Sequence, residues 1–556
     1  MFRFLGLALT TSEKLFSLLL FFSKFLSFKL KYFARDGSML KLRIHFLFLM
    51  TSFLFSCFPP FQEKEKKDNL GLYLLAARVL NANNNSCSGL WAIDFNSNGY
   101  SCQSASLVAS GTNVEIYEQT GLKAETNYTG FKYSSVATSF DSIIYPKLTT
   151  AFGNPSDIDG NKKVTIFVLD IGNGIGGYVD PVQFFGDDPT DPGFRSNQRE
   201  IIYIDGNSLL ALRKKDLSVN LPDTFLATLS HEFQHLIRMQ HELGFKTVIR
   251  TLDDVTNKTF TFDDTWINEG TSEVASDIAG YGPQYSRMAC FRGDPATDCV
   301  EGAAGYSLFA WKSSIRNYAS AYTFMSYVYN VSGNTDTEKN AFIKNTVVGN
   351  SSRIRGNTLS NLMTLFQSAA KYNSSLLGTD NTGIYRRLYA TFLSLAFNPG
   401  RYPGTSTLYI GTTNIGTMSA LQTAYPLPTT LNPIYTYASN FGIVKGSTFL
   451  MDPSAFYRVS ENSSTAPDSV DSVKVWNGNP GSFGPEFIIF NGRVDTTPII
   501  STGSILSQKM NSEETKSVSI ENENVKWQAP YSKTGELFCP HSFLLGQRAA
   551  SSRFLK

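Results

Sequence analysis

Residues 229–242 read "LSHEFQHLIRMQHE" and hold three of the five histidines of the chain. His231 and His235 are four residues apart, so on a helix their imidazoles lie one turn apart on the same face. Two neutral imidazoles in this arrangement are good zinc ligands. Glu232 is offset by one residue, close enough to reach a metal-bound water without binding the metal. The stretch therefore predicts one catalytic Zn²⁺, with Glu232 as the general base.

A long helix is expected around this stretch. Pro222 and Asp223 suit its first turn, and Gly244 can end it. Its apolar side is predicted to consist of Phe225, Leu229, Phe233, Leu236 and Ile237.

A catalytic zinc needs a third protein ligand, and the sequence offers two candidates. His241 completes the spacing HExxHxxxxxH of the metzincins, in which a glycine three residues after the second histidine breaks the helix. Arg238 occupies that position here, and an unbroken helix would turn His241 about 240° away from His235. Glu269, in "TWINEGTSEVASDIAGYG" (265–282), would instead supply a carboxylate from a second helix, as in gluzincins. We favour Glu269 and keep His241 as the alternative.

The segments "LSHEFQHLI" and "WINEGTSEVAS" resemble the hyicolysin family of bacterial zinc metallopeptidases. The similarity extends upstream through "FDSIIYPKLTTAFG", "KVTIFVLDI", "GGYVDP" and "REIIYID", and so covers roughly 105–330. The resemblance implies a thermolysin-like zinc lobe that hydrolyses protein or peptide substrates. In gluzincins with an Asn-Glu-x-x-x-Asp motif, the Asp supports a zinc-bound imidazole, and Glu273 occupies that position here.

Two absences refine this expectation. Thermolysin-like peptidases use a downstream histidine to stabilise the oxyanion, but the only histidine after His241 is His541. The nearest other donors are Tyr281, Tyr285, Arg287 and Tyr306, which the sequence does not rank. The chain also lacks the Gly-x-Met-Glu-Asn stretch of aminopeptidases, which favours a zinc endopeptidase. The alternative from another class is an adhesion or binding lipoprotein that keeps the zincin fold with little or no turnover.

The N-terminal region predicts a lipid anchor. Lys41 and Arg43 precede an apolar run, 44–55, that is too short to span a bilayer. The run ends in "LFSC", which resembles a bacterial lipobox with Cys57 as the lipidated residue. We therefore expect a signal region over 1–57, a tether over 58–70, and a protein lipid-anchored in the bacterial envelope, at the outer membrane or cell surface. Residues 1–38 are expected to be a start-site artefact, with Met39 as the first residue.

Composition and cysteine content fit an exported enzyme. The formal net charge is +2, which gives no indication of a nucleic-acid partner. Cys87 lies near Cys102 in the sequence, and Cys290 lies near Cys299, so two local disulfides are expected outside the reducing cytosol. Cys539 is left over.

The fold class is predicted to be α+β. A catalytic domain over 71–400, with a mixed sheet, the zinc-binding helix and a helical lobe, precedes a smaller β domain over 405–500 and a disordered tail over 501–556. Strands are expected at 72–80, 105–117, 163–170 and 199–205. Helices are expected at 135–152, interrupted at Pro146, and at 265–278, 307–330 and 357–395.

Two loops in this region have suggestive compositions. The stretch "GNGIGGYVDP" (172–181) lacks the Lys-Ser/Thr of a phosphate loop and is interpreted as a flexible loop near a cleft. Asp157, Asp159, Gly160 and Asn161 resemble the start of a calcium loop, but no glutamate closes it at the required position. A turn that leads into the next strand is therefore the favoured interpretation.

Overall fold

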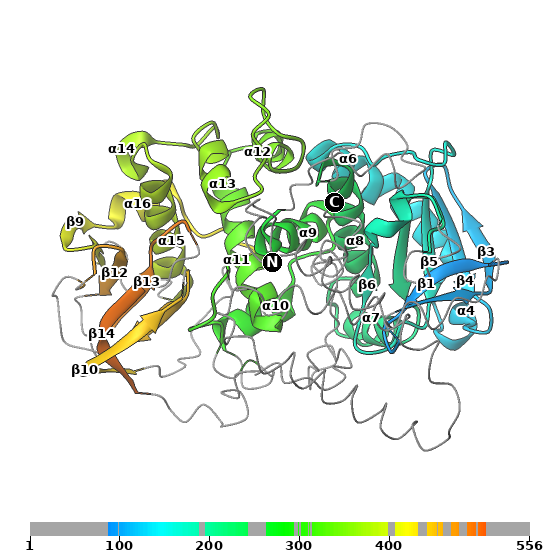
Figure 1. Ribbon diagram of the computed structural model, residues 1–556, viewed down its shortest axis with the longest axis horizontal. Helices are drawn as coiled ribbons and strands as arrows, with labels where there is room; N and C mark the ends of the chain where they lie inside the picture. Colours follow the sequence, from blue (N-terminus) through cyan, green and yellow to red (C-terminus); the bar gives the residue numbers. More distant parts are fainter. Residues whose placement is uncertain are drawn as a thin grey trace, which may run out of the picture. The chain divides into compact units, whose positions relative to one another are not determined.

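A computed structural model describes residues 87–506 of the 556-residue chain, with internal gaps (Figure 1). These residues belong to one compact unit, Gly71–Lys556. The predicted strand at 72–80, the tether, Cys57 and Cys539 lie outside the described residues. The gaps are 98, 188–194, 243–262, 294–298, 300–301, 310, 312–313, 398–405, 432–441, 453, 460–466, 468, 478–485 and 496–498.

A mixed sheet with the strand order β3-β4-β5-β7-β6 forms the first part of the described chain. The central strands β4, β5 and β7 are parallel, and the edge strands β3 and β6 pair antiparallel to their neighbours. The single strand expected at 105–117 is wrong, because the amide of Gly111 donates to the carbonyl of Val114 (2.8 Å) and closes a turn between two strands. The strands are β3 (Ala105–Ser110), β4 (Val114–Gln119), β5 (Val164–Leu169), β6 (Gly177–Tyr178) and β7 (Ile201–Asp205).

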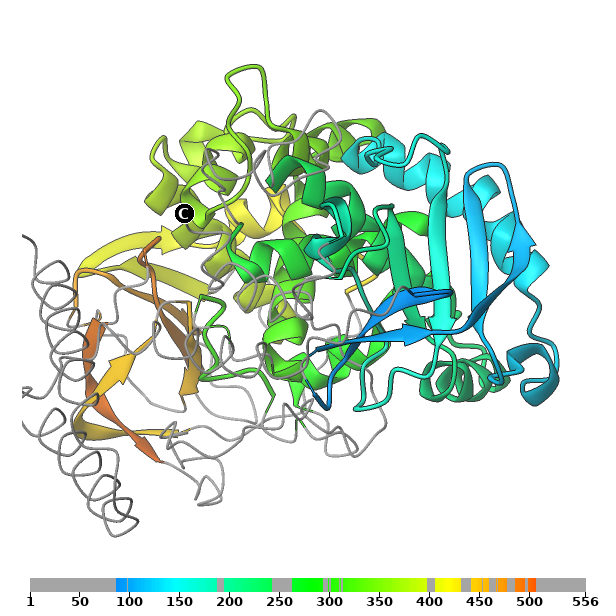
Figure 2. The ribbon, with the colours of Figure 1, turned by 45° about the vertical axis from the view of Figure 1, so that its right-hand side comes forward.

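Both faces of the central strands β5 and β7 are buried. Side chains alternate between the two faces along each strand. Ile166 and Ile204 join the core beneath the helices, whereas Phe167 and Tyr203 belong to a second cluster on the other face. The hairpin of β1 (Leu90–Asp94) and β2 (Gly99–Gln103) contributes to that second cluster (Figure 2). Near-continuous apolar runs such as "VTIFVL" in β5 are typical of strands buried on both faces.

The helix predicted over 135–152 is confirmed in three parts: α5 (Tyr133–Ser139), a π-helical turn (Phe140–Ile144) and α6 (Tyr145–Phe152). Pro146 lies in the first turn of α6. Proline has no amide hydrogen to donate, and the wider π turn before it lets the chain stay helical. The short helix α4 (Ala124–Asn127) precedes this group.

Two long helices, α8 (Thr224–Glu242) and α9 (Thr265–Ala279), pack against each other in the middle of the described chain. The predicted apolar side of α8 is buried. The other helices are α7 (Ser208–Ser218), α10 (Tyr285–Arg292), α11 (Ile315–Val331), α12 (Asp336–Val348), α13 (Leu359–Phe366), α14 (Ser374–Leu377) and α15 (Asn381–Phe397), together with a 3₁₀ turn at Pro181–Phe184.

The last part of the described chain is rich in strands, as expected. An antiparallel sheet has the order β11-β13-β12-β8-β9, and β10 pairs separately with β14. The strands are β8 (Ser406–Ile410), β9 (Thr413–Thr417), β10 (Gly442–Met451), β11 (Phe456–Val459), β12 (Ser472–Asn477), β13 (Glu486–Asn491) and β14 (Ile499–Leu506), with helix α16 (Ser419–Ala424) among them. Strand β14 has the sequence "IISTGSIL" and is the last described element of the chain.

The antiparallel sheet and the helical region share one hydrophobic core. The rings of Tyr389 in α15 and Phe490 in β13 are 5.0 Å apart, and both residues belong to the main core cluster. The domain limits inferred from the sequence stay predictions. Within the described ranges, no helix combines the length and apolar character needed to cross a bilayer.

Candidate metal centre

Helix α8 and helix α9 carry the predicted metal-binding residues. The carboxylate of Asp223 accepts hydrogen bonds from the amides of Phe225 and Leu226, which stabilises the start of α8. Helix α9 ends at Gly280, whose φ of 96° suits glycine. The predicted end of α9 agrees with the structure, whereas Pro222 and Asp223 precede α8 instead of lying in its first turn, and Gly244 lies outside the described residues.

The structure brings His231, His235 and Glu269 together, with one ligand atom from each within 4.8 Å of the others. The two Nε2 atoms are 3.0 Å apart, and Oε2 of Glu269 lies 3.4 Å from each of them. Zinc at about 2.1 Å from each donor in a tetrahedron would separate the donors by about 3.4 Å. The three side chains therefore fit a zinc ion.

The burial of Glu269 supports the same conclusion. Its side chain is fully buried, and among the described residues its oxygens contact no hydrogen-bond donor other than the two imidazoles. A buried carboxylate that accepts no hydrogen bonds destabilises the fold unless a cation compensates its charge.

His235 is held in the tautomer that a metal requires. Its Nδ1 donates to Oδ1 of Asn268 at 3.0 Å, which leaves the lone pair of Nε2 directed at His231 and Glu269. The orientation of the Asn268 amide is fixed in turn, because its Nδ2 donates to Oε1 of Glu242 at 3.1 Å. Sequence reasoning did not identify Asn268, although its place beside Glu269 in the same motif was a usable signal.

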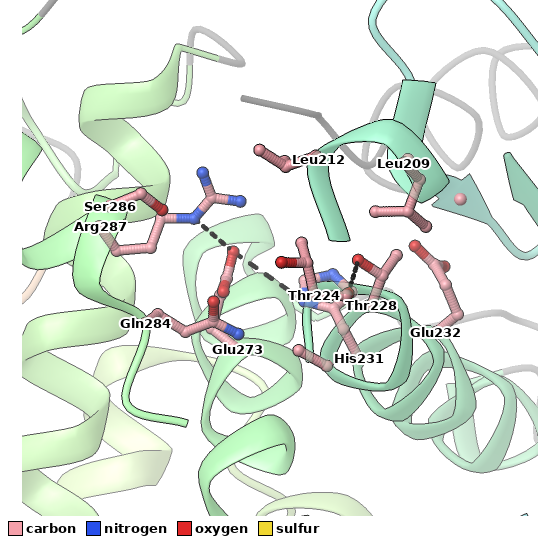
Figure 3. Close-up of a pocket in the computed structure, with 13 residues that line it drawn as sticks. Leu209, Leu212, Thr224, Thr228, His231, Glu232, Glu273, Gln284, Ser286 and Arg287 are labelled. Carbon is pink, nitrogen blue, oxygen red and sulfur yellow. Dashed lines mark hydrogen bonds and ion pairs between the residues drawn. The ribbon is translucent and has the colours of Figure 1, made fainter. Parts of the chain in front are cut away.

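His231 has a different partner for its second nitrogen. Oε1 of Glu273 lies 4.0 Å from Nδ1 of His231 and accepts a hydrogen bond of 2.8 Å from Nε of Arg287. The predicted supporting position of Glu273 is therefore next to the imidazole, and Glu273 also links that imidazole to a guanidinium group. Figure 3 shows this chain of contacts.

The two imidazoles differ in their electrostatic surroundings. Burial lowers the pKa of His231, but the contact with Glu269 and the charges of Glu273 and Glu232 outweigh burial, so its pKa is raised. Burial and the neighbouring charge of His231 hold the pKa of His235 well below its ordinary value. The carboxylates therefore make this end of α8 attractive to a cation.

Glu232 and His231 line one pocket, together with other residues of α8, residues of α7, α9 and α10, and the start of β6. In Figure 3, Glu232 and Glu273 lie on opposite sides of His231. The backbone of Gly177 approaches Glu232 closely, since a Cβ atom there would lie 3.0 Å from Cγ of Glu232. The segment 172–181 is thus near a cleft as predicted, but Gly177–Tyr178 is a buried edge strand rather than a flexible loop.

Helix α8 continues unbroken through Arg238 to Glu242. The guanidinium of Arg238 is buried and contacts Asp263, Thr271 and Thr346. His241 does not join the group of metal-binding atoms; its ring lies near Gly153 and its Nε2 is 3.3 Å from Nε2 of Gln240.

The four candidate oxyanion donors differ in whether they line the pocket. Arg287 lines the pocket, whereas Tyr281, Tyr285 and Tyr306 do not. Tyr306 instead accepts a hydrogen bond from Arg316.

Both expected disulfides are present, joining Cys87 to Cys102 and Cys290 to Cys299. Cys290 belongs to α10, the helix that carries Arg287.

No protein-family model matches the chain. The neutral metalloprotease ShpI of Staphylococcus hyicus is 26% identical over 242 residues, which are 42% of this chain and 48% of that protein. The match thus spans about half the length of this curated relative. The chain is a distant homologue of a neutral metalloprotease, and its His–His–Glu metal group is intact.

Proposed function

We propose that the chain is a zinc-dependent endopeptidase with a thermolysin-like catalytic region, in which His231, His235 and Glu269 would hold the metal. The observation that carries this proposal is the near-tetrahedral spacing of their three donor atoms beneath a pocket lined by Glu232. When bound, zinc would supply a Lewis acid that polarises a carbonyl and lowers the pKa of a water.

Glu232 is positioned to act as the general base. It lines the pocket one residue from His231, and its Cγ lies beside the backbone of Gly177, where a substrate could approach. Its carboxylate takes a proton from the attacking water and passes it to the leaving amine. Asn268 and Glu273 keep the imidazoles oriented while this happens.

Arg287 is proposed to stabilise the oxyanion that forms on the substrate carbonyl. Its Nε donates to Glu273, and in Figure 3 the other two guanidinium nitrogens point away from that carboxylate. A preorganised cation that lines the pocket is well suited to stabilise developing negative charge.

The edge of the sheet supports an extended peptide as substrate. Strand β6 ends the strand order of the mixed sheet, and Gly176 and Gly177 line the pocket. An extended segment can pair with such an edge through main-chain hydrogen bonds. This mode of binding does not require a free terminus, which agrees with internal cleavage.

The test is hydrolysis of an internally quenched peptide with both termini blocked, by purified protein of measured zinc content. We expect cleavage that 1,10-phenanthroline abolishes and added zinc restores. Cleavage that survives removal of the metal would contradict the proposed chemistry. Absence of cleavage by protein that holds one zinc per chain would favour the adhesion or binding lipoprotein.

We also propose that Cys57 is lipidated and holds the protein in a bacterial envelope. The support is the lipobox-like sequence alone. Mass spectrometry of native protein should find an N-terminal peptide that begins at Cys57 with lipid attached, and Cys57→Ala should release the protein from the membrane fraction. A mature protein that retains residues 1–56 would exclude this processing.

A further inference from the structure

A second group of potential ligands lies outside the pocket. Asp157 and Asp159 belong to the loop between α6 and β5, and Glu200 immediately precedes β7. One carboxylate oxygen from each lies within 4.8 Å of the others. The glutamate that the calcium-like sequence lacks at its own end is thus supplied by Glu200, just before β7.

Glu200 gives independent evidence that a ligand is missing from this group. It is 1% exposed, and its Oε1 accepts hydrogen bonds from the hydroxyl of Ser156 (2.5 Å) and the amide of Ile158 (2.8 Å). Its Oε2 is also buried, yet no hydrogen-bond donor in the described part of the chain reaches it. A buried carboxylate oxygen without a partner costs stability, which a bound cation would offset.

The charges around the group also favour a cation. Burial raises the pKa of Glu200, and the charge of Asp159 raises it further. Burial raises the pKa of Asp159 too, and the charge of Asp157 adds to that, while Arg199 acts in the opposite direction. When all three carboxylates are ionised, the single positive charge of Arg199 does not neutralise them, so the group keeps a net negative charge.

The loop itself is already shaped by hydrogen bonds. Oδ1 of Asp157 accepts from the amide of Lys162 (2.9 Å), and Oδ1 of Asp159 accepts from the amide of Asn161 (3.1 Å). The predicted turn is therefore present, and the carboxylates are held close together before any ion arrives. Binding would require little additional ordering of the chain.

We propose that Asp157, Asp159 and Glu200 form a Ca²⁺ site. Oxygen donors alone, without histidine or cysteine, favour calcium over zinc, and water and main-chain carbonyls can complete the six to eight ligands that calcium takes. The ion fastens the loop before β5 to the start of β7. It therefore stabilises the sheet and takes no part in hydrolysis.

Terbium luminescence and calcium titration test this site on full-length protein kept saturated with zinc throughout. Tb³⁺ substitutes for Ca²⁺, and a nearby tyrosine can sensitise its emission. Tyr145 is the candidate sensitiser, because it lies near enough to Asp157 for that carboxylate, together with burial, to raise the pKa of the tyrosine. We expect sensitised emission that calcium displaces. Saturating calcium should also raise the Tm by roughly 3 °C.

Asp159→Asn and Glu200→Gln should each weaken terbium and calcium affinity at least roughly tenfold and remove the rise in Tm. Glu200→Gln keeps an oxygen that can accept the bonds from Ser156 and Ile158, so it separates ion binding from loop structure. Asp336→Asn, an exposed carboxylate on α12, is the matched control and should behave as wild type. Equal affinity in all four proteins, or no binding by wild type, would overturn the proposal.

Discussion

The middle and the C-terminal end of helix α8 both carry histidine, in opposite electrostatic surroundings. Near its middle, His231 faces Glu269 and Glu273, and these carboxylates help to raise its pKa. At its C-terminal end, burial and the charges of Arg355 and Arg238 lower the pKa of His241 to about 4. One helix thus presents one histidine to anions and another to cations.

This difference shows that spacing alone does not make a histidine a metal ligand. His241 has an imidazole as basic as the others in water, but a divalent cation beside it would meet two guanidinium groups. Around His231 and His235 the same ion would meet carboxylates, which lower the net charge of the complex. The electrostatic surroundings therefore select the ligands from a cluster of histidines.

The largest effect should come from removing the carboxylate that completes the metal site. Glu269→Ala should lose bound zinc and all measurable hydrolysis, because two imidazoles alone bind zinc weakly. His241→Ala, its matched control, should keep both. Zinc stoichiometry and peptidase rate are measured side by side. If His241→Ala loses its zinc and Glu269→Ala keeps it, His241 is the third ligand and Glu269 is not.

Glu232→Gln should lower turnover at least roughly 100-fold while zinc content and fold stay unchanged, because the amide cannot accept the proton of the attacking water. The measurement is kcat together with metal analysis and circular dichroism. Near-normal kcat would mean that another group is the base. Loss of zinc would mean that Glu232 supports the metal directly.

Arg287→Met should lower kcat roughly 10- to 100-fold at unchanged zinc content, because it removes the cation proposed to stabilise the oxyanion. Glu273→Gln controls for the loss of the contact that Arg287 makes with Glu273. If both variants lose the same activity, the guanidinium acts through Glu273 and His231 rather than on the substrate.

Asn268→Ala should weaken zinc affinity roughly tenfold, because His235 loses the acceptor that fixes its tautomer. Competition with a zinc-binding dye measures this affinity. Glu242→Gln retains an acceptor for Nδ2 of Asn268 and should change the affinity less. Unchanged affinity in Asn268→Ala would show that Ser272, 3.1 Å from Nδ1 of His235, orients the ring by itself.

The smallest effects should appear in the pH dependence of stability at the C-terminal end of α8. Burial and the charge of Asp263 raise the pKa of Glu242 from 4.5 to about 8, so the folded state binds the extra proton and stability falls as pH rises through this range. The pKa of His241 is lowered from 6.5 to about 4, so its contribution is lost as pH falls through that range.

Chemical unfolding of metal-free protein from pH 4 to pH 8.5 separates the two contributions. Glu242→Gln should flatten the alkaline fall, and His241→Asn should flatten the acidic fall, each by up to about 1 kcal/mol per pH unit. Identical profiles for wild type and both variants would show that neither group titrates differently in the folded and unfolded states.

The sequence predicts the helical parts of the site well because their signals are local. HExxH determines which residues share a face of α8, and the motif around Glu269 marks the second helix. The contacts of Arg238 with Asp263 and Thr346 were missed, because they join residues 25 and 108 positions apart. Glu200 was missed for the same reason: it immediately precedes a neighbouring strand, and a one-dimensional pattern does not record which strands pair.

Arg238 also limits how the ligand set of this site could be changed by substitution. A metzincin-like site would need glycine in its place, but that single replacement would remove one of the two guanidinium groups that pair with the buried Asp263 in the described part of the chain. Removing one partner of a buried ion pair costs about 3–5 kcal/mol, a large share of the stability of a typical domain. A redesign towards the metzincin ligand set would therefore need further substitutions around Asp263, because Arg238 supports the fold although it is not one of the metal-binding residues.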